Sequence, residues 1–85
     1  MIQYIYTLTI KGMRCGMCEA HIDNQIRNNF KIKKVSSNRF KNETIIISLI
    51  RLDEEKIKSV IKATGYELTN ISYIEKEKKS LFHKN

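Results

Sequence analysis

The chain begins with a stretch in which apolar and polar side chains alternate. Within residues 2–10 the large apolar side chains occupy every second position: Ile2, Tyr4, Tyr6, Leu8 and Ile10. Alternation with a period of two is typical of a strand that buries one face. We therefore predict a first strand whose even-numbered residues face the core, followed by a turn at Gly12.

Residues 18–29 have a helical spacing instead. Ile22, Ile26 and Phe30 fall at i, i+4 and i+8, which places them on one stripe of a helix. Asparagine tolerates the left-handed conformation, so Asn28 and Asn29 are suited to the end of this helix. The pattern predicts a helix that packs this stripe against the first strand.

Two strands are predicted in the middle of the chain. Ile32 and Val35 anchor a short, lysine-rich segment with the character of an edge strand. Residues 38–43 are polar and predict a turn. Residues 44–50, Thr-Ile-Ile-Ile-Ser-Leu-Ile, are the most β-prone run of the chain and predict a central strand.

The second helix has signals at both ends. Asp53 is suited to the N-cap, and Leu52 and Ile57 have the spacing of a hydrophobic staple. Gly65 is suited to end the helix. The expected buried stripe consists of Ile57, Val60 and Ile61.

The remaining residues complete a known order of elements. Residues 66–74 predict a fourth strand, and residues 76–85 predict a charged C-terminal tail. The order β-α-β-β-α-β is typical of α+β ferredoxin-like folds, in which two helices cover one face of a four-stranded antiparallel sheet. We expect one domain over residues 1–75, since 85 residues leave no room for a second.

The net charge of +7 favours a solvated basic surface or one that steers towards an acidic partner. The lysines are scattered and form no nucleic-acid-binding motif, so we expect no nucleic-acid partner. The first residues lack the basic region and cleavage site of a secretory signal, and no apolar run has the length of a membrane span. We therefore expect a cytoplasmic protein without membrane insertion.

Two cysteines lie between the first strand and the first helix, in the sequence Cys15-Gly16-Met17-Cys18. Cytoplasmic thiols stay reduced, so this pair indicates metal or redox chemistry rather than a structural disulfide. The helix N-terminus favours the thiolate of Cys18 and lowers its pKa, and the charge of Arg14 acts in the same direction. Two thiolates form a soft site of low coordination number, which suits Cu(I).

Other functions of the pair have to be weighed. A thiol–disulfide oxidoreductase of the thioredoxin type is disfavoured, because this chain has no proline to supply the cis-proline beside the motif. A closed zinc site needs about four ligands. Only His21 and His83 remain as further candidates, and His21, one helical turn after Cys18, is a possible third ligand.

Three more side chains bear on this site. Met13 continues the apolar phase after the turn, which favours a core position over a ligand. Met17 lies between the cysteines and is either an auxiliary thioether ligand, a partner contact or an idle surface residue. Tyr66 follows the second helix at the same edge of the predicted fold and is placed either to cover the metal loop or to begin the last strand.

The segment 12–18, Gly-Met-Arg-Cys-Gly-Met-Cys, resembles the Gly-Met-x-Cys-x-x-Cys signature of heavy-metal-associated domains, and Gly65-Tyr66 follows the second helix as in bacterial members. This family comprises copper chaperones and N-terminal domains of metal-transporting P-type ATPases, with mercury-binding relatives. The resemblance implies Cu(I) held by Cys15 and Cys18, with Zn(II) or Hg(II) as alternatives. It also implies transfer to a P-type ATPase or another metal-homeostasis protein.

The resemblance assigns further roles by position. Met13 is implied to be the core residue behind the loop, and Tyr66 to support the metal from nearby. The protein is then a binding protein rather than an enzyme, either a monomer or a dimer bridged by metal. Arg14 departs from the small or polar residue that is commoner in relatives, and from the acidic residue of members that favour zinc or cadmium, which disfavours zinc. Met17 replaces a histidine that many bacterial copper chaperones carry.

Overall fold

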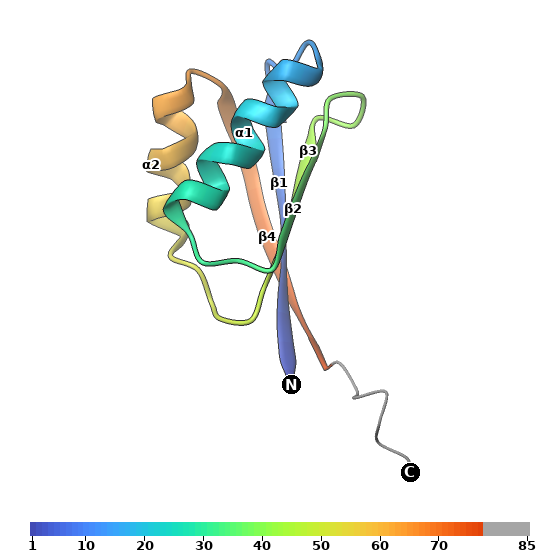
Figure 1. The fold of residues 1–85 in the computed structure, drawn as a ribbon, viewed down its shortest axis with the longest axis vertical. Helices are drawn as coiled ribbons and strands as arrows, with labels where there is room; N and C mark the ends of the chain where they lie inside the picture. Colours follow the sequence, from blue (N-terminus) through green and yellow to red (C-terminus); the bar gives the residue numbers. More distant parts are fainter. Residues whose placement is uncertain (78–85) are drawn as a thin grey trace.

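A computed structural model of the chain describes residues 1–77 as a helical layer packed on a sheet (Figure 1). The elements follow the predicted order β-α-β-β-α-β. Their bounds are β1 (Ile2–Lys11), α1 (Gly16–Asn29), β2 (Lys34–Asn38), β3 (Glu43–Ser48), α2 (Glu54–Thr64) and β4 (Glu67–Glu77).

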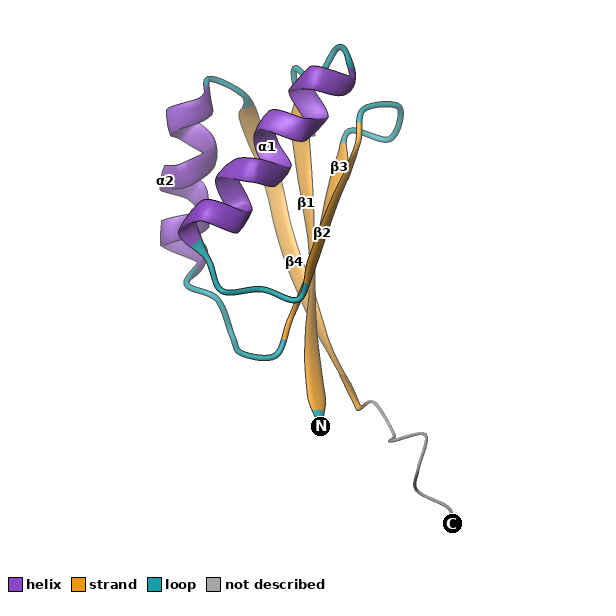
Figure 2. Cartoon of the chain, viewed as in Figure 1, coloured by secondary structure: helices purple, strands orange, loops and turns teal. Residues whose placement is uncertain are grey.

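The four strands form one antiparallel sheet in the order β2-β3-β1-β4. Both helices cover the same face of this sheet, and within residues 1–77 no helix lies over the other face (Figure 2). The predicted ferredoxin-like fold is therefore confirmed. The β1–α1, β2–β3 and α2–β4 turns lie at one end of the molecule, and the α1–β2 and β3–α2 loops lie at the other (Figure 1).

The core lies between the sheet and the helices. It consists of Tyr6, Leu8, Ile10, Met13, Ile22, Ile26, Val35, Ile46, Leu52, Ile57 and Ile61. The even-numbered residues of β1 face the core, as predicted, from Tyr6 onwards. The prediction is wrong at the start of the strand, where Ile2 is exposed and Gln3 is buried. The reason is that β1 pairs with β3 only from Tyr4, so its first residues extend past β3 and pair with β4 alone.

β3 ends at Ser48, so the prediction of strand through residue 50 is wrong. The Ser48 hydroxyl donates to the carbonyl oxygen of Ile50 (2.7 Å) and accepts from its N–H (3.1 Å). These two bonds satisfy the backbone of Ile50 locally, and the chain leaves the sheet. Leu49 and Ile50 are consequently exposed rather than part of a central strand.

The helix ends agree with the sequence in most respects. The carboxylate of Asp53 accepts from the N–H groups of Glu55 and Lys56, as expected of an N-cap. Gly65 ends α2 in the left-handed conformation, with φ of 91°. α1 ends at Asn29 as expected, but no asparagine takes the left-handed conformation there, and Phe30 continues as extended chain with φ of −136°.

The second stripe and the last strand differ from expectation in detail. Val60 is only half-buried, whereas Ile57 and Ile61 are fully buried. β4 extends to Glu77, three residues past the predicted end, because it pairs with β1 over its whole length. The rest of the predicted tail, with His83, lies outside the described residues. Within residues 1–77, neither helix has the length and apolar character needed to cross a lipid bilayer.

Candidate metal centre

The two cysteines lie at the N-terminus of α1, at the end of the molecule where three turns meet (Figure 1). Cys15 is the N-cap residue, in an extended conformation with φ of −155°. Its carbonyl oxygen accepts from the N–H groups of Cys18 (3.1 Å) and Glu19 (3.3 Å). The first turn of the helix therefore fixes Cys18 relative to Cys15 through the backbone.

The two thiols are free and converge. Their Sγ atoms lie 3.4 Å apart, and Cys15 is exposed while Cys18 is half-buried. With metal–sulfur bonds of about 2.3 Å, this separation corresponds to an S–metal–S angle of about 95°, and a linear arrangement requires about 4.6 Å. The exposed side chain of Cys15 is the one free to rotate outwards. Rotation of Cys15 away from a fixed Cys18 therefore gives the wider sulfur–sulfur separation that a near-linear S–metal–S arrangement needs.

The environment of Cys18 favours its thiolate. A hydrogen bond from the Tyr66 hydroxyl is the largest cause that lowers the pKa of Cys18 to about 7. Hydrogen bonds from the backbone of Arg14 and from Cys15 act in the same direction, and burial opposes them. The same contact with Cys18 raises the pKa of Tyr66. The thiolate fraction of Cys18 at neutral pH is therefore larger than that of an ordinary cysteine, which favours binding of a soft cation.

Tyr66 reaches the loop because its backbone and ring are both supported. Its N–H donates to the hydroxyl of Thr64 (3.3 Å), just past the end of α2. Its ring lies against Gly12, where an added Cβ would be 3.2 Å from Cδ1, and meets the ring of His21 edge-on at 6.1 Å. The hydroxyl is thereby positioned at Cys18.

We expect Tyr66→Phe to raise the pKa of Cys18 by about one unit, because it removes the hydroxyl donor that stabilises the thiolate. The thiolate fraction at neutral pH then falls. The rate of alkylation by iodoacetamide as a function of pH, measured in a Cys15→Ser background, reports this value. Tyr73→Phe, which removes the hydroxyl of a tyrosine on β4, is the matched control. An unchanged profile in Tyr66→Phe contradicts the role of the hydroxyl.

Gly12→Ala is expected to destabilise the fold by about 1–2 kcal/mol, because the backbone adopts a conformation unfavourable for alanine. The φ angle of Gly12 is 106°, and the new Cβ also pushes against Tyr66. We therefore expect a raised pKa of Cys18 as well. Urea unfolding and the alkylation profile measure the two effects. Gly65→Ala is the comparison, since φ is 91° there and nothing lies within 4 Å of its Cβ. An equal rise of the pKa in both variants refutes the proposed contact.

The other residues that the sequence suggests for the site lie in three different environments. Met13 is buried, with 6% of its surface exposed, and belongs to the core cluster. Met17 points into solvent, with 82% exposed. His21 is exposed on α1, with its ring beside Tyr66. Within residues 1–77, no three His, Cys, Asp or Glu side chains gather into a set that could hold a metal ion. The described site is thus a two-thiolate site.

Sequence reasoning missed one link that supports this site. Glu19 accepts from the backbone N–H of Arg39 (2.7 Å) and from its Nη1 (3.1 Å). This pair ties the β2–β3 turn to the first turn of α1, directly after Cys18. The guanidinium also stacks on exposed Phe40 at 4.4 Å. Glu19 and Arg39 are twenty residues apart in the chain, and no local pattern pairs them.

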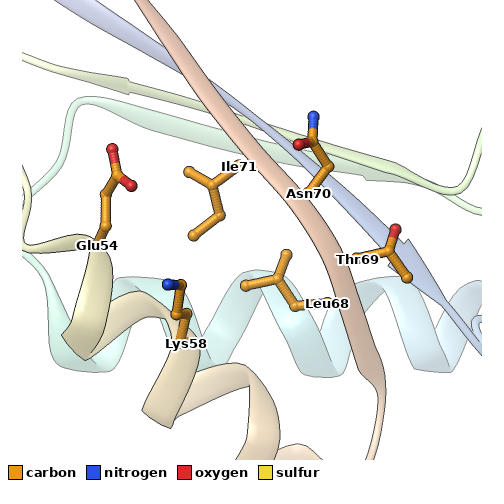
Figure 3. Close-up of a pocket in the computed structure, with 6 residues that line it drawn as sticks. All are labelled: Glu54, Lys58, Leu68, Thr69, Asn70 and Ile71. Atoms are coloured by element: carbon orange, nitrogen blue, oxygen red, sulfur yellow. The ribbon is translucent and has the colours of Figure 1, made fainter.

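A hollow of about 290 Å³ lies away from the cysteines, between α2 and β4. Figure 3 shows Glu54 and Lys58 of α2 opposite Leu68 and Ile71 of β4. Neither cysteine lines this hollow. An ion at Cys15 and Cys18 is therefore reached from solvent directly, as an exchange of ligands between proteins requires.

No protein-family model matches this sequence, and no curated protein matches it by sequence. Among solved structures, the crystal structure of oxidized MerP from Ralstonia metallidurans CH34 superposes on the chain with a TM-score of 0.68. The chain has the fold of MerP. The match covers 79% of this chain and 94% of MerP at 18% sequence identity.

The likeness to MerP agrees with the ferredoxin-like architecture described above, and it spans nearly all of the MerP chain. At 18% identity the likeness to MerP supports the fold alone. The chemistry of the present chain has to be argued from its own cysteines and their neighbours.

Proposed function

We propose that this protein binds a soft metal ion, Cu(I), through Cys15 and Cys18 and passes it to a partner protein by exchange of thiolate ligands. The observation that carries the proposal is the convergence of two free thiols, 3.4 Å apart, at an exposed helix N-terminus. Soft thiolate ligands select Cu(I) over hard cations, and two of them match its preference for low coordination.

The site has the features that ligand exchange needs. Two ligands leave a coordination position open for an incoming thiolate, which gives a three-coordinate intermediate. Cys15 is exposed and unsupported, so it is the ligand that leaves first, while Cys18 stays bound beside Tyr66. Met13 keeps the loop anchored from the core. The exposed thioether of Met17 is available as an auxiliary ligand or as a contact for the partner.

The proposal includes a cellular setting. Free thiols in a metal carrier require a reducing compartment, so we place the protein in the cytoplasm. A suitable partner carries its own exposed thiolate pair, as the soluble domain of a metal-transporting P-type ATPase or another metal-homeostasis protein does. A second copy of this chain offers the same ligands. Two copies can therefore hold one ion between their cysteine pairs, in the way that a donor and an acceptor protein do during transfer.

Competition among Cu(I), Hg(II) and Zn(II) tests the proposal. The reduced protein is titrated anaerobically with each ion against a chelator of known affinity. We expect one Cu(I) per chain and a Cu(I) affinity far above that for Zn(II). Weaker binding of Cu(I) than of Zn(II), or no binding at all, refutes the copper assignment.

Hg(II) is the second candidate, because it also prefers two thiolates and the chain shares the fold of MerP. Zn(II) is less favoured, since the described residues offer no third ligand beside the cysteines. Repeating the titrations with His21→Ala tests the remaining zinc hypothesis, in which a lost Zn(II) affinity would identify His21 as a ligand. A thiol–disulfide oxidoreductase is the last alternative, and turnover of a dithiol substrate would reveal it.

A further inference from the structure

Two loops at the end of the molecule opposite the cysteines present apolar side chains to solvent (Figure 1). They connect α1 to β2 and β3 to α2. Leu49 and Ile50 are 46% and 56% exposed. Between the loops lies a hollow of about 370 Å³, lined by Lys31, Ile32, Lys33, Leu49 and Ile50. We call these five residues the distal surface.

The exposure of Leu49 and Ile50 is built into the fold. Ser48, fully buried, binds both the N–H and the carbonyl oxygen of Ile50. The buried hydroxyl of Tyr6 accepts from the N–H of Leu52 (2.9 Å) and donates to its carbonyl oxygen (3.2 Å). The loop is therefore held at both ends. Single apolar side chains on a surface need no explanation, but a fixed loop that holds two adjacent aliphatic side chains in water indicates an interaction surface.

The charge on the two loops is predominantly positive. The two loops and the first residue of β2 contribute Lys31, Lys33, Lys34 and Arg51, with no acidic residue among positions 30–34 or 48–52. The acidic side chains nearby are largely engaged. Asp53 caps α2, Glu55 pairs with Lys58 (3.1 Å), and Glu77 pairs with the N-terminal ammonium (2.7 Å).

We propose that the distal surface docks on an anionic lipid bilayer. Aliphatic side chains flanked by lysines suit the interface, where the apolar groups enter the acyl boundary and the cations meet anionic headgroups. An acidic polypeptide satisfies the lysines, whereas the acyl boundary of an anionic bilayer also takes up the exposed side chains of Leu49 and Ile50. The docked orientation directs Cys15 and Cys18 away from the lipid. The inference does not depend on the metal.

Vesicle sedimentation with the full chain tests this inference. We expect binding to phosphatidylcholine vesicles that contain phosphatidylglycerol, and little binding to phosphatidylcholine alone. Each lysine near an anionic surface changes the affinity about fivefold, so Lys31→Gln with Lys34→Gln should weaken binding roughly 25-fold. Leu49→Ser with Ile50→Ser should weaken it roughly tenfold or more.

Matched controls lie at the cysteine end. Lys11→Gln with Lys41→Gln removes the same charge. Met17→Ser with Phe40→Ser removes two apolar side chains that are even more exposed than Leu49 and Ile50. Both should change binding less than about threefold. Equal losses in the distal and control variants show attraction by net charge alone and overturn the proposal, as does absence of binding to anionic vesicles.

The chain has no tryptophan of its own, so a single introduced tryptophan reports which part of the protein contacts the lipid. Ile50→Trp should shift its emission to the blue on anionic vesicles, whereas Phe40→Trp should not. A shift in both variants, in neither, or in Phe40→Trp alone overturns the proposed orientation. A shift of Ile50→Trp with polyglutamate and not with vesicles assigns the surface to an acidic polypeptide and overturns the lipid assignment.

Discussion

Replacing Cys15 and Cys18 together by alanine is expected to abolish high-affinity Cu(I) binding and to leave the fold intact. Thiolate zinc sites with four ligands contribute about 10–16 kcal/mol, or roughly 3 kcal/mol for each ligand, so a single loss costs on the order of 100- to 1000-fold. Loss of both ligands removes the site. The fold should persist, because Cys15 is exposed and Cys18 only half-buried.

The single variants separate the two ligands. Cys18→Ala should lose more affinity than Cys15→Ala, since it also removes the thiolate that Tyr66 stabilises. Anaerobic titration against a Cu(I) chelator measures each affinity, and circular dichroism checks the fold. Met17→Ala is the matched control within the same loop and should lose at most about tenfold. Retention of the wild-type affinity by the double variant would refute the proposed function.

Ile26→Ala is expected to cause a large loss of stability. Ile26 is fully buried between α1 and the sheet, and truncating such a side chain costs about 2–5 kcal/mol through lost burial and the cavity that remains. In a domain of this size, each kcal/mol lowers Tm by about 4–8 °C. Thermal unfolding should therefore show a decrease in Tm of about 8–16 °C for the lower end of that cost.

Ile50→Ala makes the same chemical change at a position that is 56% exposed. Its expected cost is within about 0.5 kcal/mol, because little burial is lost there. The difference between the two variants isolates the contribution of the core from that of the side chain itself. If both variants melt at the same temperature, the packing of α1 on the sheet is not as described.

The sequence predicts the elements well wherever a local signal exists. Asp53 and Gly65 mark both ends of α2, since the cap and the left-handed conformation depend on nearby residues only. Period-two alternation located β1, and the cysteine pair was identified from its spacing and its place before a helix. These features depend on the chemistry of a few consecutive residues, which the sequence shows directly.

The remaining features depend on contacts between distant segments. Strand propensity predicts that the third strand continues through Ile50. Propensity contains no information about the hydrogen bonds by which the Ser48 hydroxyl binds the backbone two residues ahead. The alternating pattern predicts that Ile2 faces the core. The pattern does not show that the pairing of β1 with β3 begins only at Tyr4. The helix N-terminus and Arg14 were expected to lower the pKa of Cys18, whereas the largest cause is Tyr66.

The dependence of Cys18 on Tyr66 has a consequence for the newly made chain. A ribosome releases the cysteines long before it releases Tyr66, at about 5–20 residues per second. Until β4 emerges and pairs with β1, the thiol of Cys18 lacks its main hydrogen-bond donor. The low pKa of the Cys18 thiol is therefore acquired only after Tyr66 has emerged and the sheet has formed. A nascent chain that stops before Tyr66 carries both cysteines without this stabilisation of the Cys18 thiolate.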